Sequence, residues 1–163
     1  VDHPIIFEEP NVEVNSLNIK RVSDIIVEKN PSIVITHVPF DYHKEHRSTY
    51  ELVKESVEWA AHTTIYKDPC QINRLLLMEV NTLIDNPHVI LDISNVIDKK
   101  IAAIKKYVSQ TSKFDWQYYE KFNLKKAELR GIQGNCEYAE AFIVEPIVVN
   151  SPFYPIKTTN LLV

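Results

Sequence analysis

Glycine is scarce in this sequence: its 163 residues include only Gly131 and Gly134. An α/β protein normally uses several glycines to turn at the ends of its strands. Two glycines cannot form a GxGxxG fingerprint or a P-loop, so no glycine-rich loop is present to cradle a phosphate. A nucleotide- or sugar-binding Rossmann-like module is therefore the weaker of the interpretations that the chain allows.

Cysteine, basic charge and long apolar runs are also in short supply. Cys70 and Cys136 match neither a metal-binding spacing nor a disulfide framework, which favours a reducing cytosol and two inert packing residues. The net charge of −4 and the pI near 5.9 indicate no basic field for nucleic acid or anionic lipid. No apolar run approaches the roughly 20 residues that span a bilayer, and no signal peptide opens the chain. We expect a cytoplasmic protein without a membrane span.

The hydrophobic pattern predicts alternating helices and strands. Helices are expected over residues 17–29, 48–63, about 95–110 and 114–130, and strands over 33–35, 75–80, 89–93 and 138–144. The run at 75–80 also fits a buried helical turn. The run Ile33-Val34-Ile35 is continuous and β-branched, which is typical of a strand covered on both faces. Gly131–Gly134 is expected to form a loop that ends the last helix. The length and the 45% hydrophobic content predict a single domain, residues 1–163.

The densest group of ionisable residues is the turn Pro39–Arg47, between a predicted strand and a predicted helix. In open α/β sheets, ligands bind at this end of the strands. His43 and His46 are three apart, so their rings can converge at the start of a helix, and Asp41 or Glu45 can orient a ring through its second N–H. Imidazole is a common zinc ligand, but a catalytic zinc needs three protein ligands, so this turn supplies only part of a site. Two ordinary surface histidines are the alternative.

The other histidines fit structural roles. His37 lies inside the predicted strand, where a hydrogen-bonded core histidine is expected. His3, His62 and His88 are isolated in the sequence and are expected to face solvent.

Three blocks of the sequence carry a family resemblance. Val34–His37 reads VITH and is followed by DYHKEHR at Asp41–Arg47; the stretch from Asp92 ends in Ser109-Gln110; and Tyr138–Phe142 reads YAEAF. In this order, across residues 1–143, the blocks resemble the PIG-L (LmbE-like) zinc-dependent N-deacetylases. The resemblance implies an α/β fold, Rossmann-like and three-layered (α/β/α), with a mostly parallel sheet.

The resemblance also implies roles for particular residues. His46 would bind zinc, His43 would act beside the scissile amide, and Glu45 would orient the His43 ring. Tyr138 would form a wall of the substrate pocket or contact the oxyanion. The implied reaction is hydrolysis of an N-acetyl group on a glucosamine-containing small molecule or conjugate, with zinc as cofactor.

The chain departs from the family pattern at its start. The His-Pro-Asp-Asp segment that would supply two further zinc ligands and the general base is absent, and the chain opens on Val1 rather than on methionine. We favour the interpretation that these residues are the later part of a longer deacetylase, and we expect little activity from them alone. The alternative is an inactive relative that binds or scaffolds a sugar conjugate. The apolar tail Pro152–Ile156 fits a homo-oligomer contact and folding back equally well.

Overall fold

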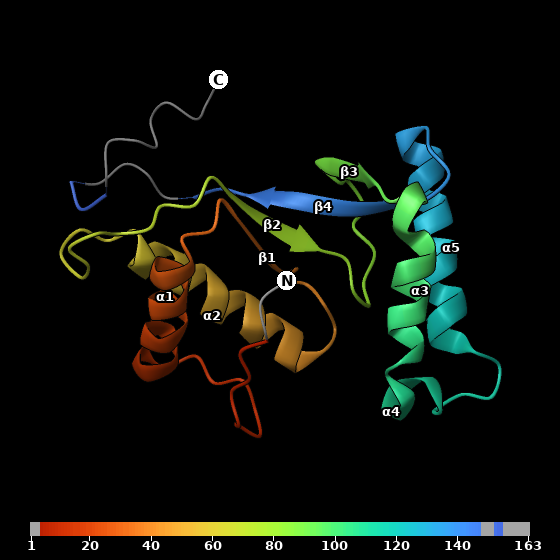
Figure 1. The fold of residues 1–163 in the computed structure, drawn as a ribbon, viewed down its shortest axis with the longest axis horizontal. Coiled ribbons are helices and arrows are strands. Elements are labelled where there is room, and N and C mark those ends of the chain that lie inside the picture. The colour runs from red at the N-terminus through yellow and green to blue at the C-terminus, as the bar shows by residue number, and fades with distance from the viewer. Residues whose placement is uncertain (1–3, 148–151, 155–163) are drawn as a thin grey trace. The chain divides into compact units, whose positions relative to one another are not determined.

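The computed structural model describes residues 4–147 and 152–154 (Figure 1). Its elements are α1 (Ser16–Lys29), β1 (Ile33–His37), α2 (Lys44–Ala60), β2 (Arg74–Met78), β3 (Val89–Asp92), the 3-10 helix η1 (Ser94–Val96), α3 (Ile97–Lys105), α4 (Val108–Thr111), α5 (Tyr118–Gly134) and β4 (Ala139–Glu145). The chain divides into two compact units, of which the second is Leu83–Ile143 and the first holds the other described residues. No helix in the described ranges is long and apolar enough to cross a bilayer.

The four strands form a mixed sheet in the order β1-β2-β4-β3. β1 and β2 run parallel, with Ile33 opposite Arg74 and His37 opposite Met78. β3 and β4 run antiparallel, with Val89 opposite Phe142. The expected α/β class is therefore correct, but the expectation of a mostly parallel sheet is not supported. Consecutive apolar runs do not reveal strand direction, which depends on how the connecting segments cross.

Two helices of the first unit pack side by side through small residues (Figure 1). Ser23 and Ser56 are fully buried where α1 meets α2. The Ser23 hydroxyl donates to the carbonyl oxygens of Ile19 at 2.7 Å and of Ser56 at 3.1 Å, so its burial leaves no hydroxyl unpaired. α1 ends as predicted at Asn30, whose left-handed backbone and N–H to the Ile26 carbonyl close the helix before Pro31.

β1 is covered on only one face within the described residues. Thr36 and the β2 residues Leu75 and Leu77 are each at most 2% exposed, whereas Ile33 and Ile35 are 49% and 51% exposed. The prediction that this strand is covered on both faces is therefore wrong for the described part of the chain. A β-branched run is compatible with a strand whether or not its second face is covered. The run alone therefore could not show how many faces of β1 are covered.

The described part of the tail, residues 152–154, folds back onto the C-terminal end of α2. Tyr154 is buried, and its hydroxyl donates to Glu58 at 2.6 Å. Burial, followed by the Glu58 carboxylate, raises the pKa of Tyr154 to about 12. The Phe153 ring stacks on His62. The backbone carbonyl oxygen of Phe153 accepts the Thr63 N–H at 2.8 Å. The rest of the predicted apolar tail, beyond Tyr154, lies outside the described residues, and a homo-oligomer contact stays a prediction.

The second unit has its own apolar cluster. Its buried members are Ile93, Ile97 and Ala127, with Ile101, Leu124 and Tyr138 packed against them. The single helix expected over residues 95–110 is instead η1, α3 and α4, and the chain leaves helical geometry at Tyr107. Val108, which continues the apolar spacing in the sequence, is 67% exposed. The apolar face therefore ends before Val108, where the short helix α4 begins as a separate element in contact with α3 and α5.

The two glycines lie inside α5 rather than in a loop after it. The helix ends at Asn135, which takes the left-handed conformation with a φ of 56° and donates its N–H to the Gly131 carbonyl. A Cβ at Gly131 would lie 2.4 Å from the Glu137 carbonyl oxygen and 2.7 Å from that of Cys136. Gly131 is thus required because the returning backbone passes against the helix, not because the helix ends there.

Gly131→Ala is expected to lower the free energy of unfolding by about 3 kcal/mol, since the new methyl group meets backbone that cannot move aside cheaply. Gly134→Ala is the matched control. Its Cβ would lie 2.4 Å from the Cγ2 atom of Ile90, a side-chain atom that can shift more readily than backbone, so a smaller loss is expected. Chemical denaturation of both variants measures the difference, and equal losses would contradict the close backbone approach.

Candidate functional site

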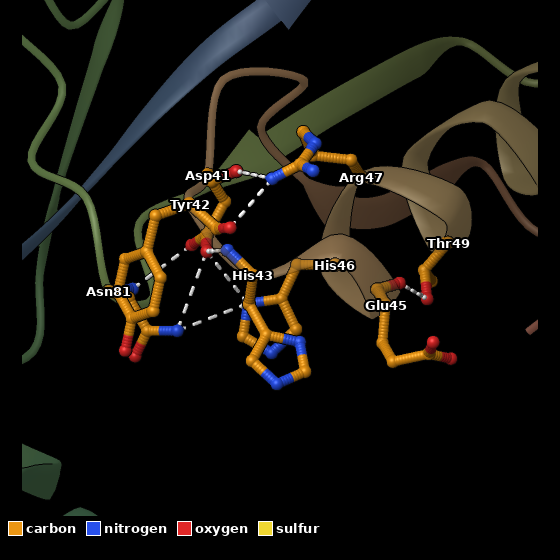
Figure 2. A network of polar contacts seen from close by, with 8 residues as sticks. All are labelled: Asp41, Tyr42, His43, Glu45, His46, Arg47, Thr49 and Asn81. Atoms are coloured by element: carbon orange, nitrogen blue, oxygen red, sulfur yellow. Dashed lines mark hydrogen bonds and ion pairs between the residues drawn. The ribbon is translucent and has the colours of Figure 1, made fainter. Parts of the chain in front are cut away.

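The turn that joins β1 to α2 is organised around the carboxylate of Asp41 (Figure 2). Asp41 is 1% exposed. Its Oδ1 accepts the His43 N–H at 2.9 Å, and its Oδ2 accepts the Asn81 N–H at 3.2 Å. The Arg47 guanidinium donates to the carbonyl oxygens of Asp41 and Tyr42 at 2.8 and 2.7 Å. The turn is therefore fixed both from α2 and from the segment that follows β2.

The environment of Asp41 favours its ionised form. Burial by itself would raise the pKa of this carboxyl group. The hydrogen bonds from the His43 N–H, the His46 ring and the Asn81 N–H outweigh that effect and hold the pKa below its ordinary value of 3.8. An ionised carboxylate at neutral pH thus lies beside His46.

His46 is oriented by this charge. Its Nδ1 lies 3.3 Å from Asp41 Oδ1 and 3.4 Å from the side-chain nitrogen of Asn81. An ionised carboxylate can only accept, so a hydrogen bond to Asp41 requires the proton on Nδ1, and the Asn81 side-chain nitrogen, also a donor, then makes no hydrogen bond to that atom. The lone pair of the His46 ring is then on Nε2. A carboxylate behind one nitrogen and a free lone pair on the other is the usual arrangement of a metal-binding histidine.

Three imidazole rings gather at the end of β1. The His37 ring stacks on His46 with centroids 4.3 Å apart, and the His43 ring lies 4.9 Å from His46. Burial, followed by the neighbouring His46, lowers the pKa of His37, which favours its neutral form. Its buried Nδ1 has no hydrogen-bond partner among the described residues, so the expectation of a hydrogen-bonded core histidine fails for this atom.

The described residues do not complete a metal site. They contain no group of three or more histidine, cysteine, aspartate or glutamate side chains arranged to hold a metal ion. His37 and His46 present ring faces to each other, whereas ligands of one ion must aim lone pairs at one point. His46 with Asp41 behind it fits a single zinc ligand, and a catalytic zinc needs two more from protein.

The other predicted site residues lie in different surroundings. His43 is the N-cap residue of α2, where its exposed ring is beside His46. The Glu45 carboxylate points away from His43 (Figure 2) and accepts the Val12 N–H at 2.7 Å. There it lines a cavity of about 160 Å³ together with Phe7 and residues 9–13. Tyr138 belongs to the second unit, where its side chain packs against the apolar cluster of that unit.

Asn81 is a residue that the sequence did not single out. It follows β2, the parallel neighbour of β1, and reaches Asp41 through both its backbone and its side chain. Neighbouring parallel strands end at the same edge of a sheet. An asparagine just after the second strand could therefore have been predicted to lie near the turn that follows the first.

Comparison with solved structures identifies the fold. The conserved protein TT1542 from Thermus thermophilus matches with a TM-score of 0.77 and 20% identity over 91% of this chain. The N,N'-diacetylchitobiose deacetylase from Pyrococcus horikoshii matches with a TM-score of 0.73 and 22% identity over 90%. GalB, the 4-carboxy-2-hydroxymuconate hydratase from Pseudomonas putida, matches with a TM-score of 0.67 and 24% identity over 85%. No family model and no curated protein matches the sequence.

The chain therefore has the α/β fold that these proteins share. It spans 67% of the length of the Thermus protein, 62% of the hydratase and 58% of the deacetylase. Because one fold here carries both a deacetylase and a hydratase, the fold alone does not name the reaction.

Proposed function

We propose that the protein takes part in zinc-dependent hydrolysis of an N-acetyl group on a glucosamine-containing small molecule or conjugate. The observation that carries this proposal is the pairing of Asp41 with His46 at the C-terminal end of β1, with the His43 ring 4.9 Å from His46. Its support is the resemblance of this turn to the PIG-L deacetylases and the fold shared with a diacetylchitobiose deacetylase.

In this proposal, His46 binds zinc through Nε2. Asp41 accepts a hydrogen bond from Nδ1 of the same ring and so keeps the proton on that nitrogen. The remaining ligands come from residues other than those described. Zinc, when bound, would polarise the amide carbonyl and lower the pKa of a bound water. His43 donates a proton to the leaving amine, since its exposed ring lies beside His46. Tyr138 as a substrate contact rests on the resemblance alone.

The restraint on His43 is also part of the proposal. The resemblance gives that role to Glu45, but the Glu45 carboxylate is engaged with the Val12 N–H. Asp41 accepts the His43 backbone N–H, so it is the better candidate for fixing the position of the His43 backbone from which the ring extends. Glu45 would then act indirectly, by holding residues near Val12 against the first turn of α2.

The test is release of acetate from N-acetylglucosamine conjugates, followed together with the appearance of the free amine. The natural full-length protein with zinc is expected to release both in equal amounts. Residues 1–163 alone are expected to release little or none, because their described part holds no three-ligand group. Robust turnover by residues 1–163 alone would contradict the incomplete site. A full-length protein that binds zinc but deacetylates no such conjugate would favour the binding or scaffolding alternative.

A further inference from the structure

The charge of this chain is unevenly distributed. The whole sequence has a net charge of −4, yet residues 99–126 contain eight lysines and only two acidic residues, Asp115 and Glu120. This stretch lies in the second unit, from within α3 to within α5. Three of these lysines are in ion pairs, Lys100 with Glu140, Lys105 with Glu120 and Lys125 with Glu128, and Lys126 is buried. The excess positive charge of the stretch therefore comes from the other four lysines, at positions 99, 106, 113 and 121.

Large apolar side chains are exposed within the same region. Tyr107 and Val108 are each 67% exposed, Trp116 is 56% exposed and Phe114 is 44% exposed. They lie in and around α4 and its connection to α5, which together occupy one end of the α3–α5 helices (Figure 1). We call residues 105–121 the basic aromatic tip.

Contacts in the tip and with the neighbouring Phe122 hold two of these side chains, Phe114 and Trp116, in place. The Phe114 ring lies 6.3 Å from Trp116 and 5.2 Å from Tyr118, and Tyr118 stacks on Phe122. Lys121 lies over the Trp116 ring, at 5.9 Å from its centroid. The part of the tip that leads into α5 is therefore one cluster of rings with an ammonium group beside it.

We infer that the basic aromatic tip docks onto the surface of a membrane that contains anionic phospholipid. Tryptophan and tyrosine prefer the level of the lipid headgroups, where the ring is in an apolar region and its polar atom stays hydrated. Lysines beside them are attracted by the negative surface potential of such a membrane. The attachment is peripheral: Trp116, Phe114, Tyr107 and Val108 enter the interface, and the lysines face phosphate groups.

Single-stranded nucleic acid is the other anionic polymer to consider, and the tip suits it less well. Bases stack on open ring faces. Here Trp116 meets Tyr118 edge to face at 71°, and Tyr118 meets Tyr119 at 75°, so the rings cover one another. Val108 offers no π-face at all, but its exposed side chain suits a lipid interface. Two copies of the tip, each with four lysines against two acidic residues, would carry charge of the same sign and repel each other.

The chain offers a built-in reporter for this inference. It has two tryptophans, so Trp59→Phe leaves Trp116 as the sole source of tryptophan fluorescence. With vesicles of phosphatidylcholine and phosphatidylserine, we expect the Trp116 emission to shift to shorter wavelength and brominated lipid to quench it. Vesicles of phosphatidylcholine alone should give little change, and high salt should reverse the shift because it screens the lysines.

Charge variants test the role of the lysines. Lys106→Ala with Lys113→Ala is expected to weaken vesicle binding by about fivefold for each lysine removed. Lys20→Ala with Lys67→Ala, which removes two charges elsewhere, is the matched control and should bind as the parent does. Circular dichroism and the unfolding transition check that each variant is folded, as expected for substitutions on the surface.

Several results would overturn the inference. Absence of a Trp116 shift with the anionic vesicles is one, and equal binding to phosphatidylcholine vesicles is another. Binding of a single-stranded oligonucleotide in preference to vesicles would assign the tip to nucleic acid. A shift that grows with protein concentration in the absence of lipid would assign it to a second copy of this chain.

Discussion

Replacing His46 by alanine is expected to lower the rate of acetate release by the natural full-length protein by more than about 100-fold. Removing a group that only orients a metal ligand already costs roughly 10- to 100-fold, and His46 is proposed to be the ligand itself. The comparison of kcat/KM on one N-acetylglucosamine conjugate, at saturating zinc, measures the effect.

The matched control for this prediction is His88→Ala, which removes another histidine side chain, an exposed one just before β3. It should leave the rate nearly unchanged. A His46→Ala protein that stays folded and keeps most of its activity would remove His46 from the proposed site.

Asp41→Asn is expected to lower the free energy of unfolding by about 2 kcal/mol and zinc affinity by roughly 10- to 100-fold. The new amide has a similar shape, but one of its two ends becomes a donor. It would then face one of the groups that now donate to the carboxylate, namely the His43 N–H, the Asn81 N–H or His46 Nδ1. Asp41→Ala removes every acceptor and should cost about 3 kcal/mol.

The stability difference between the parent and Asp41→Asn should depend on pH. The native pKa of Asp41 lies below its ordinary value of 3.8, so its ionised form stabilises the folded protein. That contribution is fully present above the ordinary value and is lost as the pH falls through the native pKa. Denaturation of both proteins across this range tests it. A difference that stays constant as the pH falls through this range would show that the charge of Asp41 is not what matters. Asp85→Asn, at an exposed position in the segment between β2 and β3, is the control.

The elements around the site could be predicted because their signals are local. The β-branched run gave β1, the apolar spacing gave α1 and most of α2, and the ionisable residues between them gave the turn. The position of His43 and His46 at the start of a helix follows from those local patterns, and the structure places the two rings 4.9 Å apart.

What could not be predicted depends on contacts that are distant in sequence. The buried carboxylate of Asp41 organises the turn partly because it accepts a hydrogen bond from the N–H of Asn81, which is 40 residues away. Glu45 turned to the Val12 N–H, 33 residues away, although its position in the sequence suited a partner for His43. Gly131 was predicted to end the helix. A glycine that allows close backbone approach cannot be distinguished, in sequence, from a glycine that caps a helix.

Zinc content tests the central claim most directly, because it reports on His46 without requiring the right substrate. Elemental analysis of the natural full-length protein, after loading with zinc and exhaustive dialysis, should find about one zinc ion per chain. His46→Ala should lose that zinc while His88→Ala keeps it. If His46→Ala retains the zinc of the parent protein, the turn around Asp41 is not a metal site and the account given for it is wrong.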